Sequence, residues 1–128
     1  MGVFVVCAAL LGLLAVVLAV NVSLMRGRKK ISLGDGGDPE MLAAIRAQAN
    51  FIEFVPLSLI LIDMLDDYYG FWTVAALSVM LLGGRVLHAG GMLGYLKFGR
   101  TVGAVLTLAV LVLASVGLIL VKLHLKPY

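Results

Sequence analysis

The sequence predicts an all-α integral membrane protein, a bundle of four transmembrane helices in a single domain over residues 1–128. The chain is 62% hydrophobic and 13% charged, with a mean hydropathy of +1.12, whereas soluble domains are about 45–50% apolar and about 25% charged. Four apolar runs, at about residues 3–25, 39–66, 71–90 and 100–122, are each long enough to cross a hydrocarbon core of about 30 Å.

The basic residues are few and lie at the ends of the apolar runs, where they suit lipid headgroups rather than nucleic acid. Four of the five residues 26–30 are basic, and this cluster ends the first run. The first run has no basic residue ahead of it and no small-residue cleavage site, which favours a retained helix over a removed signal peptide. The cluster is interpreted as a stop-transfer and headgroup anchor, with attraction of an anionic ligand as the alternative.

The second helix is predicted to begin close to Pro39. Asp38 is a favourable N-cap residue, proline suits the first helical position, and Glu40 suits the positive end of the helix dipole. Further along, Arg46, Asn50 and Glu53 lie within about 60° of one another at about 100° per residue, so they form one polar stripe. Such groups within a span normally face protein, water or ligand. Interhelical polar contacts and a ligand site both explain the stripe.

The third helix ends in a glycine-rich segment that contains Arg85 and His88, which are three residues apart and therefore neighbours on one face. An arginine reaching toward headgroups beside an interfacial histidine is the simpler interpretation. Residues 89–99 are predicted to be a loop. Gly99 and Gly103, like Gly90 and Gly94, match a close-packing motif, but the match is weak in a chain with 15 glycines. The acidic residues Asp63, Asp66 and Asp67 are interpreted as a solvated loop, and no metal is expected.

The distribution of Lys and Arg predicts the topology. The loops after the first and third helices carry the positive charges, so they are placed in the cytoplasm, with both termini on the other side. The rise of about 1.5 Å per residue gives the depth of each polar group within its span. On this count almost all the unexplained polar groups fall in the cytoplasmic half of the bundle, namely Arg46, Asn50, Glu53, Arg85, His88 and Arg100. This position favours a site for a polar, mostly anionic ligand that enters from the cytoplasm.

The segment from Arg46 to Pro56 resembles the Arg-x-x-x-Asn-x-x-Glu-x-x-Pro signature of the MAPEG family, the membrane-associated proteins in eicosanoid and glutathione metabolism. The whole chain is similar in size, in its four spans and in the position of Arg85-x-x-His88. Residues 34–37, Gly-Asp-Gly-Gly, are most similar to the small bacterial branch. The resemblance implies a homotrimer in the bacterial inner membrane, with glutathione bound between neighbouring subunits on the cytoplasmic side.

The resemblance also implies roles for particular residues. Arg46 would bind a glutathione carboxylate, Glu53 the ammonium group and Asn50 the peptide. Phe54 stands where many members of the family have tyrosine. The remaining implied contacts come from Arg85 and His88 in the third helix, from Arg28 at the end of the first, and from Arg100, the candidate for the catalytic arginine that stabilises the thiolate.

Three functions are consistent with these residues. The first is a membrane glutathione S-transferase or glutathione-dependent peroxidase that acts on a lipophilic small molecule from the bilayer. The second is a non-catalytic scaffold that binds lipid or glutathione. It is favoured by Phe54 and Met92, which stand where enzymes of the family that bind glutathione carry tyrosines. The third is a small proton-coupled multidrug exporter that uses Glu53, although it leaves Arg46, Asn50 and Arg85 unexplained.

Overall fold

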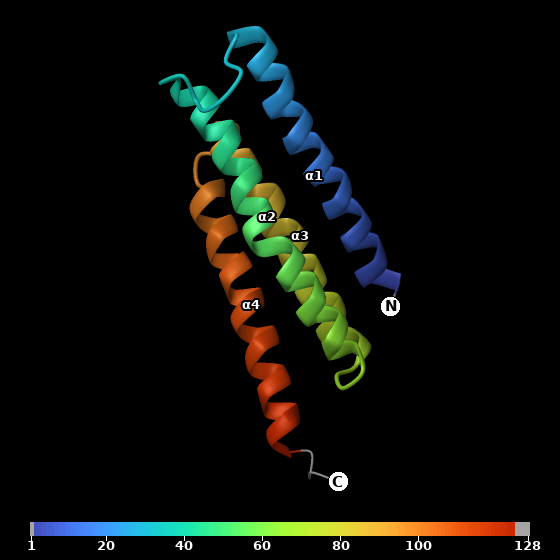
Figure 1. Cartoon of the computed structure of the whole chain (residues 1–128). Helices are drawn as coiled ribbons and strands as arrows, with labels where there is room; N and C mark the ends of the chain where they lie inside the picture. Colours follow the sequence, from blue (N-terminus) through green and yellow to red (C-terminus); the bar gives the residue numbers. More distant parts are fainter. Residues whose placement is uncertain (1, 125–128) are drawn as a thin grey trace.

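A computed structural model of the chain describes residues 2–124. It contains the helices α1 (Gly2–Lys29), α2 (Pro39–Asp66), α3 (Phe71–Met92) and α4 (Gly99–His124). Each of these four helices is long and apolar enough to cross a membrane, which confirms the all-α, four-span prediction. The α1–α2 and α3–α4 loops lie toward one end of the bundle, and the α2–α3 turn, the start of α1 and the end of α4 lie toward the other (Figure 1). The predicted tail at 125–128 lies outside the described residues.

The central pair of helices, α2 and α3, separates α1 from α4. The most extensive contact joins α3 to α4, while α1 packs on α2 and α3 and shares no contact with α4 within residues 2–124. The core between them is apolar and includes Leu11, Phe51, Leu81 and Val110. The outward faces of α1 and α4 are also apolar, which is the pattern expected where lipid surrounds a bundle.

The α1–α2 connection is held by charged side chains. Helix α1 continues to Lys29, beyond the predicted end near residue 25, because basic residues are favourable in the last turn of a helix. The Lys29 Nζ lies 2.9 Å from Asp38 Oδ2 and 3.1 Å from Glu40 Oε2. As predicted, Asp38 caps α2, since its Oδ1 accepts a hydrogen bond of 2.9 Å from the Met41 amide. The end of α1 is thereby tied to the start of α2.

Titration of Asp38 should make the stability of this connection depend on pH. The Met41 amide and the Lys29 ammonium stabilise the carboxylate and hold the pKa of Asp38 below its ordinary value of 3.8. The stabilisation is therefore complete above that ordinary value and is lost as the pH falls through the lower folded-state pKa. We expect the melting temperature, followed by circular dichroism, to fall over this acidic range.

Asparagine is the matched control because it keeps the capping oxygen and does not titrate. Asp38→Asn should remove the part of the pH dependence that comes from this residue, whereas Asp38→Ala should lower the melting temperature at every pH. An unchanged acid profile in Asp38→Asn would contradict the assignment.

Glycine residues allow α3 and α4 to pack backbone against backbone. A Cβ atom on Gly103 would collide with the Gly84 carbonyl oxygen and the His88 amide, and one on Gly91 would collide with the Arg100 amide. Gly99 and Gly103 thus form a true packing pair, whereas Gly94 faces open space and adopts a positive φ of 86° in the loop. Helix α3 also continues to Met92, into the segment predicted to be a loop. This seam brings the start of α4 against the end of α3.

Candidate functional site

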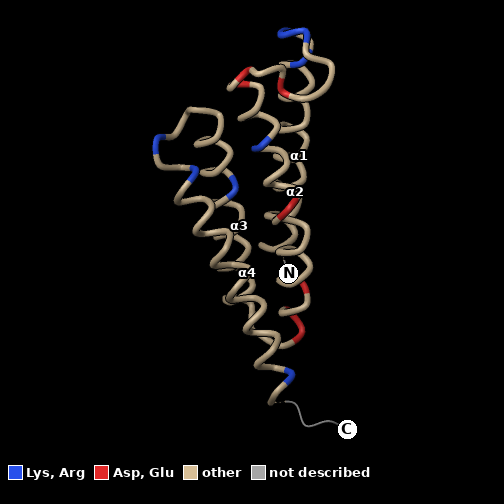
Figure 2. The backbone as a smooth tube through the Cα atoms, turned by 60° about the vertical axis from the view of Figure 1, so that its left-hand side comes forward, with Lys and Arg blue, Asp and Glu red and all other residues tan. Residues whose placement is uncertain are grey.

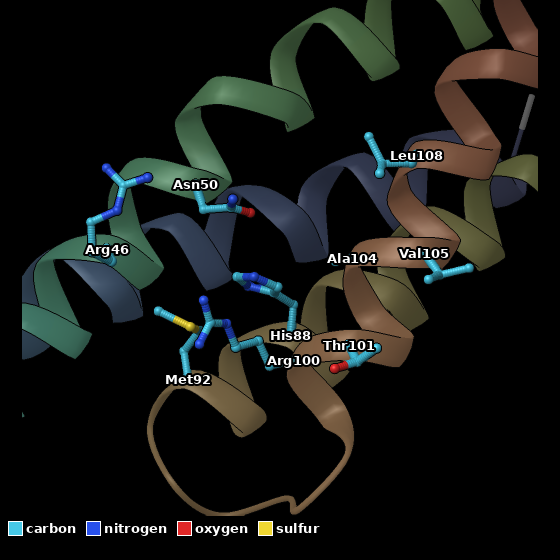
Figure 3. A pocket seen from close by; sticks show the side chains of 9 residues that line it. All are labelled: Arg46, Asn50, His88, Met92, Arg100, Thr101, Ala104, Val105 and Leu108. Carbon is cyan, nitrogen blue, oxygen red and sulfur yellow. The ribbon is translucent and has the colours of Figure 1, made fainter.

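A cavity of about 480 Å³ lies between α2, α3 and α4 near the loop end of the bundle. Asn50 enters it from α2, His88 from α3 and Arg100 from α4, while Arg46 lines its edge with a side chain that turns along α2 (Figure 3). The wall is completed by Met92 and by residues of α4, namely Thr101, Ala104, Val105 and Leu108. The Arg100 guanidinium, an amide and an imidazole therefore face one space with an apolar side, and Arg46 stands at its edge. This arrangement suits an anionic ligand beside an apolar one.

Arg46 and Glu53 form an ion pair on the outward face of α2. Their nearest charged atoms are 3.7 Å apart, and each side chain is 51% exposed. Although Glu53 belongs to the predicted polar stripe, it is not part of the cavity wall. Polar groups within a membrane span normally face protein, ligand or water, because lipid tails offer no hydrogen bonds.

Arg85 is buried next to the cavity rather than in its wall. It is 1% exposed, and no carboxylate within residues 2–124 lies within 4.0 Å of it. Its Nη2 is 3.3 Å from His88 Nδ1, its Nη1 is 3.5 Å from Thr107 Oγ1, and its guanidinium carbon lies 5.7 Å from the centre of the Phe51 ring. The simpler expectation of an arginine reaching toward headgroups is therefore wrong, because this side chain points into the bundle.

Phe54 and Arg28 lie in two smaller cavities. Phe54 lines a space of about 230 Å³ together with Asn50, Arg85, Thr107 and Leu108, so this space shares residues with the main cavity. Arg28 lines one of about 190 Å³ with Asn21, Glu40 and Tyr95. Met92 belongs to the walls of both the Arg28 cavity and the main cavity. Four of the predicted site residues thus line the main cavity of a single chain, namely Arg46, Asn50, His88 and Arg100. The other four lie around it, namely Glu53, Phe54, Arg85 and Arg28.

The charge distribution places the site at the basic end of the bundle. Figure 2 shows that Lys and Arg gather around the α1–α2 and α3–α4 loops, with a few acidic residues beside the α1–α2 loop. Asp63, Asp66 and the C-cap residue Asp67 close α2 at its other end. Lys97 lies in the α3–α4 loop, and Arg100 lines the cavity from the start of α4. An anionic ligand approaching from the loop end would therefore meet attractive charge.

Sequence reasoning missed the contribution of α4. Apart from Arg100, none of the α4 residues in the cavity wall was identified from the sequence. Thr101, Ala104, Val105 and Leu108 follow the i, i+3, i+4, i+7 spacing, so they form one face of the helix. Small and apolar residues at this spacing are common in every membrane helix. The sequence signal that marks the inward side of α4 is the spacing of Gly99 and Gly103. In the structure both glycines contact the backbone of α3.

The geometry defines a four-span membrane protein with a polar cavity at its basic end. The family model described as MAPEG family matches residues 4–120, so the chain belongs to the MAPEG family. The chain is also similar to the inner membrane protein YecN of Escherichia coli K12 and to the protein of the same name from E. coli O6:H1. Each is 30% identical over 82 residues, which are 63% of this chain. The chain spans 63% of the length of these curated relatives.

Proposed function

We propose that the protein is a membrane-bound glutathione S-transferase or glutathione-dependent peroxidase. The observation that supports this proposal is the cavity lined by Arg46, Asn50, His88 and Arg100 from three helices. Family membership supports it as well, because glutathione is a ligand associated with this family. The product of the reaction is an altered lipophilic molecule, which fits a cavity whose remaining wall is apolar.

Each polar group matches a part of glutathione. A guanidinium binds a carboxylate through short, charge-assisted hydrogen bonds, which is the role assigned to Arg46. Asn50 offers both a donor and an acceptor to a peptide group. Glu53 takes the ammonium group and Arg28 takes a second anionic group, both from positions around the main cavity. His88 adds a hydrogen bond from α3.

Arg100 is assigned to the sulfur atom. A cation beside a thiol favours the thiolate, which is the nucleophilic form, and the thiol proton leaves to water. In the transferase reaction the sulfur forms a bond to an electrophilic carbon, and the leaving group departs with the electron pair of the broken bond. In the peroxidase reaction the sulfur attacks a hydroperoxide oxygen and releases an alcohol. A second glutathione then reduces the resulting sulfenic acid, giving the disulfide and water.

A homotrimer with cytoplasmic loops 1 and 3 is part of this proposal. The half-exposed pair of Arg46 and Glu53 supports assembly, because a second copy would supply the polar cover that lipid cannot. A neighbouring copy could also bring its Arg28 to the cavity. The basic loops support the orientation, and the E. coli relatives, named inner membrane proteins, support a location in the bacterial inner membrane.

A non-catalytic scaffold that binds lipid or glutathione is the second candidate. The observation that favours it is the pair Phe54 and Met92, which line the cavities with apolar side chains where hydroxyl groups could contact a ligand. The scaffold and the enzyme share the binding site and differ in whether the bound sulfur is ionised.

Titration with glutathione tests the proposal. The protein, purified in detergent, should bind glutathione with a rise in the thiolate absorbance band. Arg46→Met should weaken binding roughly 10- to 100-fold, because it removes hydrogen bonds to a charged group. Lys122→Met is the matched control, since it removes an exposed cation at the other end of α4. Binding without thiolate would favour the scaffold, and no binding at millimolar glutathione would exclude the enzyme and leave only a scaffold that binds lipid.

A further inference from the structure

The hydrogen bond between Arg85 and His88 determines which imidazole nitrogen carries the proton. A guanidinium group has only donors, so the His88 Nδ1 that lies 3.3 Å from Arg85 Nη2 must be an acceptor. An imidazole that accepts at Nδ1 is neutral and carries its proton on Nε2. His88 therefore has one nitrogen occupied by Arg85 and one N–H group left to donate.

The other contacts of Arg85 hold it in this position. Thr107 Oγ1 donates its hydrogen to the Gly103 carbonyl oxygen over 2.8 Å, so toward Arg85 Nη1 it can only be an acceptor. The Phe51 ring covers the guanidinium at 5.7 Å. Arg85 is 1% exposed, and its Nε has no hydrogen-bond partner within residues 2–124. The arginine is thus oriented by α4 and α2 and donates along α3 to His88.

His88 lines the main cavity, whereas Arg85 does not. Figure 3 shows the His88 ring between the side chains of Asn50 and Arg100. We infer that Arg85 is a positioning residue that holds His88 as the neutral Nε2–H tautomer, a hydrogen-bond donor to the ligand and not a base. For the identity of that ligand, and only for that, the inference rests on the proposed function.

This assignment specifies the chemistry that the cavity accepts. The charged groups around His88 are Arg85 from α3, Arg100 from α4 and Arg46 from α2, whose carboxylate partner Glu53 lies outside the cavity. With His88 as a donor, the site offers hydrogen bonds chiefly to acceptors such as carboxylate, carbonyl or thiolate. The thiol proton would then leave to water rather than to His88, and the positive charge of Arg100 would select the ionised sulfur.

Nitrogen-15 NMR of histidine-labelled protein, without any ligand, tests the tautomer directly. The chain contains 2 histidines, and the structure gives their Nδ1 atoms opposite hydrogen-bonding roles. The His124 Nδ1 lies 2.8 Å from the Leu120 carbonyl oxygen and must donate to it, whereas His88 Nδ1 accepts. His88 should therefore show an unprotonated Nδ1 and a protonated Nε2. His124→Gln assigns the two sets of signals.

Variants separate positioning from a merely structural role. Arg85→Met should convert the His88 signals to an average of both tautomers and weaken glutathione binding about fivefold, the effect of one hydrogen bond. Arg85→Lys should restore the His88 tautomer in part, because it keeps a donor. Thr107→Val removes one of the contacts that orient Arg85 but leaves its donor groups, so it should change the tautomer less than Arg85→Met does.

Three results would overturn the inference: a protonated His88 Nδ1 in the wild-type protein, an unchanged tautomer in a folded Arg85→Met protein, or equal changes in Arg85→Met and Thr107→Val. The wild-type spectrum decides the first of these even if Arg85→Met does not fold. Because that spectrum is recorded without glutathione, a failure to bind glutathione would refute the proposed function and leave the tautomer assignment standing.

Discussion

Arg100→Met should abolish the thiolate absorbance of bound glutathione and lower kcat by roughly 10²- to 10³-fold. The magnitude is that of removing the one group assigned to stabilise the ionised sulfur. Methionine keeps most of the length of the side chain, and Arg100 lines the cavity from the first turn of α4. Turnover should be measured with a chromogenic chloronitrobenzene and with a lipid hydroperoxide, so that the two reactions are compared in the same variant.

Lys97→Met is the matched control for charge. Lys97 is an exposed cation in the same loop, it lies 5.7 Å from the Phe98 ring centre, and it is absent from the cavity wall. Its replacement should leave the thiolate band and kcat within about twofold of the wild-type values, because exposed charges act weakly through solvent. If Arg100→Met retained a full thiolate band, the role assigned to Arg100 would be wrong.

Gly103→Ala should destabilise the protein by about 3 kcal/mol and disrupt ligand binding. The added methyl group would meet the Gly84 carbonyl oxygen and the His88 amide, both backbone atoms that cannot move without separating α3 from α4. Separation of the helices would also widen the cavity that they share. Unfolding in mixed micelles, followed by circular dichroism, measures the first effect, and glutathione titration measures the second.

Gly83→Ala is the matched control on α3. A Cβ atom at Gly83 meets nothing within 4 Å, so this substitution should be neutral or stabilise the helix by about 0.5–1 kcal/mol. The contrast between two Gly→Ala changes in adjoining helices separates packing from helix propensity. A Gly103→Ala protein that unfolds within about 0.5 kcal/mol of the wild type would contradict the close backbone contact.

The helices and part of the cavity could be predicted because each depends on local sequence. Long apolar runs specify spans, and the cap at Asp38 specifies where α2 begins. Arg46 and Asn50 share a face of one helix, and counting depth along the spans relates them to His88 and Arg100. These inferences require only helical geometry and the cost of polar groups in lipid.

The parts that the sequence could not predict depend on how the helices turn toward one another. Arg85 and His88 share a face of α3, yet the cavity includes His88 and excludes Arg85, because α4 lies close against Gly84 and its Thr107 contacts Arg85. Glu53 shares the stripe with Asn50 but faces outward. Helical periodicity groups residues by face but does not show which residue of a face lines the cavity. The position of the neighbouring helix decides that.

Met92 has a consequence for the volume that a ligand can occupy. Its side chain is part of the partition between the main cavity and the cavity that contains Arg28. Methionine is unbranched and rotates about three side-chain bonds, so this partition can move without any displacement of the backbone. The room beside Arg100 is therefore set by the rotamer of one thioether as well as by the packing of α3 against α4.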